Sequence, residues 1–95
     1  MTVTDNADEH RFELRAEGEL AHLDYRRGGG RLVLVHTEVP KALSGRGRGG
    51  ELVEAAVDTA VSHGLTVVPA CSFASAFLRG HPEIASRVKI KWPRE

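Results

Sequence analysis

Hydrophobic and polar residues alternate in the first half of the chain. In HRFELRAE, Phe12, Leu14 and Ala16 fall on one side and charged residues on the other, which predicts a strand with one solvated face. A second stretch, LAHLDYRR, ends at the glycines 28–30, a hairpin turn signal. A third, RLVLVHTEV, is rich in β-branched residues and ends before Pro40, because proline cannot donate to a strand ladder. Together they predict an antiparallel meander.

The second half of the chain changes to a helical period. Residues 51–62 carry one apolar stripe, and His63 and Gly64 provide an end signal. The apolar positions of this stripe are Leu52, Val53, Ala56, Val57, Ala60 and Val61. LTVVPAC then predicts a buried strand, parallel to the strand before the helix if a right-handed crossover joins the two.

The last quarter predicts two short helices and a tail. Ser72 is the expected cap of a helix over FASAFLRG, and HPEIASRV restarts a shorter one with Pro82 in its first turn. The last residues, KIKWPRE, indicate a tail that Trp92 holds against the rest of the domain. Residues 1–9 are polar and aperiodic and are expected to be disordered, which leaves one domain over residues 10–95. The fold class is therefore α+β, a meander followed by a β-α-β unit.

Composition narrows the function classes. The 95 residues carry 13 Lys plus Arg and 13 Asp plus Glu, a formal net charge of zero, which argues against a nucleic-acid coat or a polybasic membrane anchor. One cysteine, Cys71, excludes an internal disulfide and a cysteine-cluster zinc site, and His10, His22 and His63 have no ligand spacing. We therefore expect no metal. No stretch has the length of a membrane span, and the polar start is unlike a secretory signal, so we expect a cytoplasmic protein.

The glycine-rich stretch GRGRGG lies between a strand end and a helix start. A helix N-terminus offers unpaired amides and positive potential, so it suits an anion of phosphate type. No Lys-Ser/Thr follows the last glycine, as a P-loop would require, and the dinucleotide fingerprint fits only loosely. Two other interpretations of this stretch remain, an RNA-binding tract and a plain turn. Glycine-arginine tracts that bind RNA are usually repeated, whereas this one occurs once. Four glycines in six positions would cost a plain turn much conformational entropy.

The longer stretch VPKALSGRGRGGELV resembles the acetyl-CoA-binding signature of the GNAT superfamily of N-acetyltransferases. Gly47 and Gly49 occupy its two glycine positions, and Ser44 stands where that family usually has Arg or Gln. A second block, VVPACSFASAFLRGHPE, is similar to the closing motif of a subfamily of very short GNAT-like domains. The resemblance implies a minimal GNAT-like fold with splayed central strands and a C-terminal helix, acetyl-CoA as co-substrate and an amine as acceptor.

The resemblance also implies site residues. The pantetheine arm would lie along residues 36–39, with Thr37 and Val39 as binding residues, and the pyrophosphate would lie on the amides of residues 45–50. Side chains of Arg46 and Arg48 are candidates for the phosphates. The full set of candidate cofactor-binding residues is Thr37, Val39, Gly45, Arg46, Gly47, Arg48, Gly49, Gly50, Ser72 and Phe77.

Three residues are catalytic candidates. Cys71 lies at a strand end before a helix N-terminus, a position that favours thiolate, so it is a nucleophile, an acetyl relay or a structural residue. Glu38 and His36 share one strand face and are candidates for the base that deprotonates the amine. Phe77 stands where family members usually place a tyrosine acid, and His81 is a candidate partner of Cys71.

Two function classes follow. The first is acetyl-CoA-dependent N-acetyl transfer to an amine. The second is a non-catalytic acyl-CoA-binding or interaction module, favoured by the missing tyrosine and by a chain too short for the helices that usually build an acceptor pocket. We expect a monomer or a weak homodimer with no nucleic-acid or membrane partner.

Overall fold

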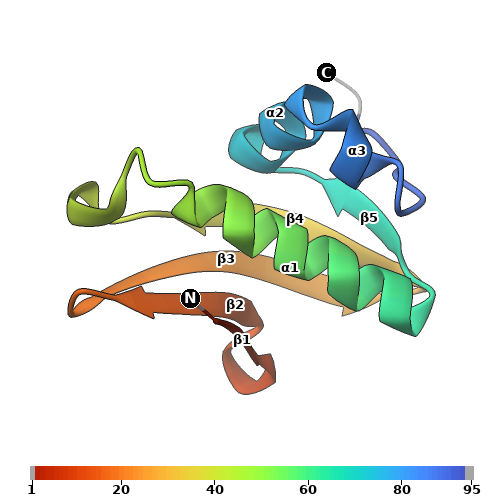
Figure 1. Cartoon of the computed structure of the whole chain (residues 1–95). Helices are drawn as coiled ribbons and strands as arrows, with labels where there is room; N and C mark the ends of the chain where they lie inside the picture. Colours follow the sequence, from red (N-terminus) through yellow and green to blue (C-terminus); the bar gives the residue numbers. More distant parts are fainter. Residues whose placement is uncertain (1, 94–95) are drawn as a thin grey trace.

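The computed structural model describes residues 2–93, and their core element is one five-stranded sheet (Figure 1). The strands lie in chain order, β1 to β5. Neighbours from β1 to β4 are antiparallel, and β5 runs parallel to β4. The strand bounds are β1 Val3–Asn6, β2 Arg11–Ala16, β3 Glu19–Gly28, β4 Arg31–Glu38 and β5 Thr66–Pro69. The predicted meander and the parallel crossover are both confirmed, as is the α+β class.

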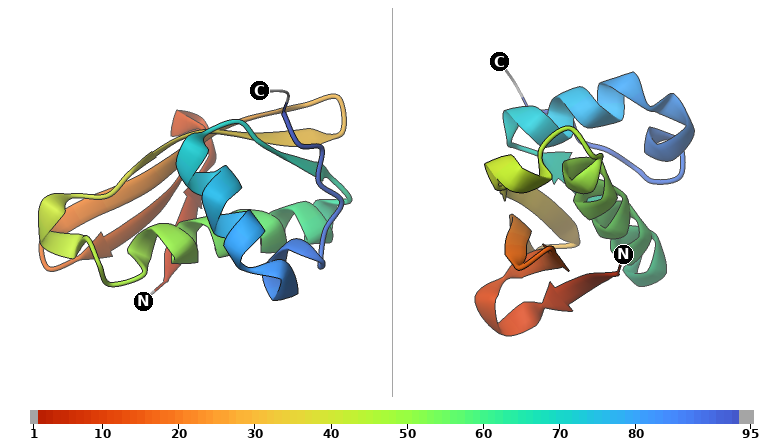
Figure 2. Two further views of the ribbon diagram at one scale, coloured as in Figure 1. Left: turned by 90° about the horizontal axis from the view of Figure 1, so that it is seen from above. Right: turned by 60° about the vertical axis from the view of Figure 1, so that its left-hand side comes forward.

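One long helix, α1, lies across this sheet, and two shorter helices follow β5 (Figure 2). Their bounds are α1 Arg48–His63, α2 Ser72–Gly80 and α3 Pro82–Ala85, and short 3-10 turns cover Ala7–Glu9 and Lys41–Leu43. Beyond α3 the tail rejoins the sheet, because the Val67 amide donates to the Lys89 carbonyl and the Lys91 amide donates to the Val67 carbonyl, both at 2.9 Å. Among residues 2–93, no helix is long and apolar enough to cross a bilayer.

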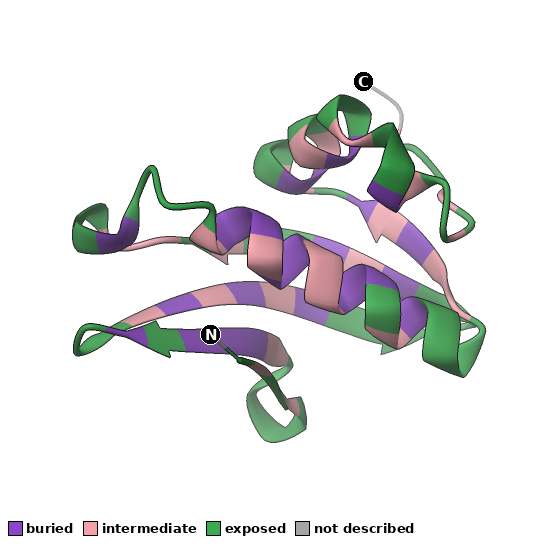
Figure 3. Ribbon diagram, viewed as in Figure 1, coloured by how far each residue is buried: buried purple, intermediate pink, exposed green. Residues whose placement is uncertain are grey.

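The hydrophobic core lies between α1 and one face of the sheet (Figure 3). The predicted strand alternation is confirmed, since Phe12, Leu14 and Ala16 are buried while Arg15 between them is exposed. The stripe of α1 is confirmed except at Val61, which is 51% exposed. Burying a large apolar side chain stabilises the fold by about 1.5–3 kcal/mol. The opposite face of the central strands carries mostly polar side chains.

Two local expectations are wrong. Residues 3–6 form β1 and residues 7–9 a 3-10 turn, where disorder was expected. The reason is tertiary pairing with β2 and a hydrogen bond of 2.6 Å from the Tyr25 hydroxyl to Asp5 Oδ1, neither of which leaves a periodic signal in so short a segment. The cap of α2 is Cys71, whose Sγ accepts from the Ala74 amide at 3.4 Å, and the expected cap, Ser72, is the first helical residue instead.

Candidate functional site

The glycine-rich stretch performs two different structural tasks. Gly45 and Gly47 have φ of +77° and +74°, in the left-handed region that favours glycine, and face open space. Helix α1 then begins at Arg48, earlier than predicted, so Gly49 and Gly50 lie inside its first turn. An added Cβ at Gly49 would lie 2.5 Å from a ring carbon of Phe73, and one at Gly50 would lie 2.5 Å from a ring carbon of Phe77.

The last two glycines therefore let α2 approach the first turn of α1. Phe73 and Phe77 lie over this turn with their rings stacked, at a centroid distance of 6.3 Å. Phe73 is still 42% exposed, and it lines a cavity of about 280 Å³ at the glycine loop. The other lining residues are Val39, Leu43, Ser44, Gly45, Gly47, Arg48 and Gly49. The cavity lies beside the free amides at the start of α1, where a helix favours an anion.

Both arginines of the loop already have carboxylate partners. Arg46 forms an ion pair with Glu17, which lies in the turn between β2 and β3. Arg48 pairs with Glu51 one turn later in α1, at 2.9 Å, while its own Nε is buried and has no hydrogen-bond partner within the described residues. Arg48 also lines the cavity, so it places a positive charge beside the helix-start amides, and such a donor set suits a phosphate group.

The strands β4 and β5 separate beside this loop. Their pairing runs from Arg31 and Thr66 to Leu34 and Pro69 and then stops. The Leu34 carbonyl accepts both the Ala70 amide at 2.9 Å and the Cys71 amide at 3.0 Å, which closes the paired part. Beyond this point β4 continues to Glu38 with no described partner on its β5 side, so its backbone groups there are free to bind an extended ligand.

A β-bulge in β4 lies at the same point. Tyr25 pairs with Leu34 whereas Asp24 pairs with His36, so Val35 is an extra residue without a partner on β3. The bulge sends Thr37 to the core face and leaves His36 and Glu38 on the opposite face. The Thr37 hydroxyl therefore lies on one side of the opening between the strands, and the side chains of His36 and Glu38 lie on the other.

On the core side of the opening, the Thr37 hydroxyl and the Cys71 thiol lie 3.3 Å apart. Cys71 is half-buried, and its Sγ also receives the Ala74 amide at the start of α2. His81 is not its partner. It lies at the other end of α2, where its Nδ1 donates to the Phe77 carbonyl at 2.8 Å and its ring stacks on Phe77 with centroids 4.0 Å apart.

On the other side, two histidine–carboxylate pairs lie next to each other. His36 Nε2 is 3.2 Å from Glu38 Oε2 on β4, and His22 Nδ1 is 3.0 Å from Asp24 Oδ1 on β3. The strand register sets each histidine beside the other pair's carboxylate. His22 and Asp24 were not predicted as site residues, although the alternation of β3 could have placed both on this face.

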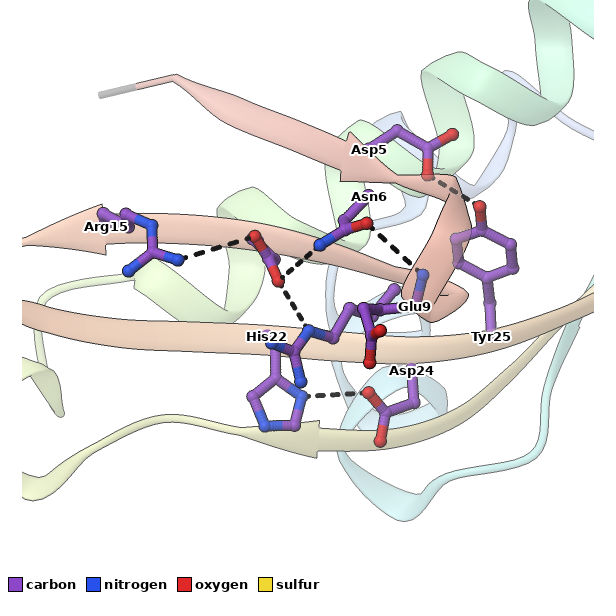
Figure 4. A network of polar contacts seen from close by, with 9 residues as sticks. Asp5, Asn6, Glu9, Arg15, His22, Asp24 and Tyr25 are labelled. Carbon is purple, nitrogen blue, oxygen red and sulfur yellow. Dashed lines mark hydrogen bonds and ion pairs between the residues drawn. The ribbon is translucent and has the colours of Figure 1, made fainter.

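Polar and charged side chains of β1, β2 and β3 form hydrogen bonds and ion pairs with one another (Figure 4). Hydrogen bonds from Arg11 at 2.6 Å and Asn6 at 3.1 Å hold the pKa of the Glu13 carboxyl below its usual range. Burial, together with the hydrogen bond to Asp5, raises the pKa of Tyr25 to about 12. This tyrosine lies on the core face and ties β3 to the edge strand β1.

Within residues 2–93, no three histidine, cysteine, aspartate or glutamate side chains gather closely enough to hold a metal ion.

The comparisons with known proteins agree with the fold. A family model described as GCN5-related N-acetyl-transferase matches residues 11–88. The solution structure of a GCN5-like N-acetyltransferase candidate from Staphylococcus aureus is similar, with a TM-score of 0.73 and 25% sequence identity over 99% of this chain and 91% of that chain.

Proposed function

Because the chain belongs to the GCN5-related N-acetyltransferase family, we propose that it transfers an acetyl group from acetyl-CoA to an amine. The observation that carries this proposal is that two features adjoin, and we call the route from one to the other the ligand path. Val39 lines the cavity at the glycine loop and follows directly after β4, whose edge beyond Leu34 has no described partner on the β5 side. The cavity at the loop offers helix-start amides and the Arg48 side chain, while the opening offers unpaired backbone of β4. Both features suit one long ligand with a pyrophosphate and an amide-bearing arm.

The binding residues divide along this path. We assign the pyrophosphate to the amides of residues 45–50, with Arg46 and Arg48 turning from their carboxylate partners toward the phosphates. The pantetheine arm would add to the free edge of β4 as a strand does, beside Thr37 and Val39. Ser72 and Phe77 complete the proposed set on α2, and Phe73 joins them because it lines the cavity.

The reacting end of the path lies near Cys71. Acetyl-CoA supplies an acetyl thioester, and the transfer forms an amide C–N bond as the C–S bond breaks. We assign His36 and Glu38 to take the proton that an incoming ammonium must lose, because they form a hydrogen-bonded pair on the open face beside the opening. Cys71 lies across the opening, where its thiol can accept the acetyl group first or serve as a wall.

One assay separates transfer from binding alone. We expect purified protein with acetyl-CoA to release free thiol faster when amines are added, in a saturable manner. Saturable acetyl-CoA binding without thiol release above the uncatalysed rate would instead identify a non-catalytic acyl-CoA-binding module. Absence of acetyl-CoA binding would contradict both.

Intact-mass measurement during the same reaction tests the role of Cys71. If the thiol is a relay, the protein gains one acetyl group that an added amine removes, and Cys71→Ser lacks the gain. If the thiol only lines the site, the mass of the protein stays unchanged and Cys71→Ser keeps most of the rate of acetyl transfer. Ser62→Ala, which alters an exposed serine near the end of α1, serves as the control.

A further inference from the structure

Helix α2 presents three faces with different surroundings. Ala74 and Leu78 are buried in the core, and Phe73 and Phe77 pack over the glycines of α1. The third face lines a second cavity, of about 410 Å³, which is separate from the cavity at the glycine loop. Its lining from α2 is Ser72, Ser75, Ala76 and Arg79, and it reaches Cys71 at the end of β5.

An arginine with no carboxylate partner among the described residues lines this cavity. The Arg79 guanidinium lies 4.2 Å from the centroid of the Trp92 ring, and its Nε is 3.4 Å from Ser75 Oγ. Stacking on an aromatic ring fixes the plane of the guanidinium. No aspartate or glutamate of residues 2–93 pairs with it, whereas Arg46, Arg48 and Arg87 each have a carboxylate partner. Arg79 therefore keeps charged donors available beside the cavity.

The two cavities lie on different sides of α2 and both reach the region of its N-terminus. Cys71 lines the second cavity, and Phe73, two residues later, lines the first. If the thioester arrives through the opening beside Cys71, an acceptor in the second cavity would meet it at the same end of α2. This part of the argument rests on the proposed function.

We propose that the second cavity binds the acceptor, and that the acceptor carries a carboxylate as well as the reacting amine. The planar fork of Arg79 suits a carboxylate, and the Ser75 hydroxyl is a further donor. Ser72 and Arg79 are seven residues apart on one helix, or roughly 10 Å along its axis. A carboxylate at Arg79 therefore reaches the reaction point only through a chain of several bonds, as in an ω-amino acid.

A series of acceptors of increasing length tests this assignment. Thiol release is measured with ω-amino acids from β-alanine to 6-aminohexanoate and with alkylamines of the same length. We expect the longer amino acids to have a KM at least about 10-fold below that of the matching alkylamines, since hydrogen bonds to a charged group are lost in the latter.

Substitution of Arg79 identifies the group responsible. Arg79→Gln is expected to raise the KM for 6-aminohexanoate about 10–100-fold while kcat and the KM for hexylamine stay near their original values. Arg79→Lys keeps the positive charge but lacks the planar guanidinium, and its KM for 6-aminohexanoate is expected to lie between those of the unaltered protein and Arg79→Gln. Arg87→Gln, which removes an arginine already paired with Glu54 and Asp58, is the control and should match the unaltered protein.

Two outcomes would overturn the assignment while leaving the proposed function intact. In one, transfer proceeds with equal KM for amino acids and alkylamines. In the other, Arg79→Gln weakens acetyl-CoA binding instead of acceptor binding, so that the arginine serves the co-substrate. If no acceptor reacts, calorimetry on the CoA-saturated protein decides: binding of 6-aminohexanoate that Arg79→Gln abolishes supports the assignment, and absence of such binding refutes it.

Discussion

The pairs β2–β3 and β4–β5 belong to one sheet but differ in how completely they are joined. Strand β2 is paired with β3 from Arg11 to Ala16, and the polar side chains at that end of the sheet form hydrogen bonds with one another. Strand β5 is paired with β4 only as far as Pro69, after which the strands separate. In the closed part of the sheet the backbone groups are paired between strands, whereas in the open part β4 has backbone donors and acceptors without a described partner on the β5 side.

The largest expected effect comes from a charge at the start of α1. Gly47→Asp places a carboxylate where the proposed pyrophosphate lies, so we expect acetyl-CoA affinity to fall at least about 100-fold in calorimetry. The fold itself should lose only about 1 kcal/mol, because aspartate tolerates the left-handed conformation better than most residues.

Gly64→Asp is the matched control for this change. Gly64 ends the same helix with φ of +66° and also faces open space, so the strain is comparable but the charge is distant from the loop. Equal acetyl-CoA affinity in the two variants would show that the glycine loop does not bind the pyrophosphate.

The next effect concerns how α2 is held against the open region. Gly50→Ala forces a methyl group into the Phe77 ring, and we expect a loss of about 1–3 kcal/mol in the free energy of unfolding by urea titration. Gly80→Ala, at a helical position with no heavy atom within 4 Å, should be neutral or stabilising by up to about 1 kcal/mol. Similar free energies of unfolding for the two variants would mean that the Phe77 ring moves away from the added methyl group at no cost.

A smaller effect is expected in the closed region. Tyr25→Phe removes the hydrogen bond to Asp5 and should cost about 0.5–1.5 kcal/mol at neutral pH without changing acetyl-CoA affinity. The folded pKa of Tyr25, about 12, lies above the ordinary value of 10.0, so folding favours the protonated hydroxyl. Its contribution is complete below pH 10.0 and is lost as the pH rises toward 12.

Alkaline unfolding therefore provides the check on Tyr25. The stability difference between the original protein and Tyr25→Phe should shrink between pH 10.0 and about 12. A difference that stays constant over this range would contradict the proposed coupling between the hydroxyl and the fold.

The smallest effect should come from the hydrogen bond between the Thr37 hydroxyl and the Cys71 thiol, which crosses the open strands. Thr37→Val keeps the shape and removes the hydroxyl beside Cys71, and we expect less than about 0.5 kcal/mol in stability because sulfur forms weak hydrogen bonds. The reaction is the more sensitive measurement: alkylation of Cys71 should change in rate if the hydroxyl orients the thiol. An unchanged rate would leave the contact without a role in reactivity.

Much of the fold could be predicted from local patterns. The alternation around Phe12 and Leu14 gave the first long strand, and the stripe around Val53 and Val57 gave α1, because both patterns arise from burial of one face. The parallel pairing of β5 with β4 was expected on the condition that a right-handed crossover joins them. The strand and the helix depend on residues close together in the chain.

The features that escaped prediction depend on distant partners. Val3 is the one apolar residue of β1, so its pairing with β2 left no pattern. Gly49 and Gly50 resemble helix breakers, and only the approach of Phe73 and Phe77 explains them inside a helix. For the site, the opening beside Cys71 was expected from the family resemblance, whereas the pairing of Arg46 with Glu17 came from the structure.

The extra residue in β4 has a consequence for the whole strand. Before Val35 the even-numbered side chains face the core, as Leu32 and Leu34 do, and after it the odd-numbered Thr37 does. The strand thus changes phase once along its length, and every side chain beyond that point owes its direction to the change. If Val35 were instead paired regularly with Asp24, the two sets would exchange, and His36 would turn inward and Thr37 outward. The same side chains would then expose a different surface.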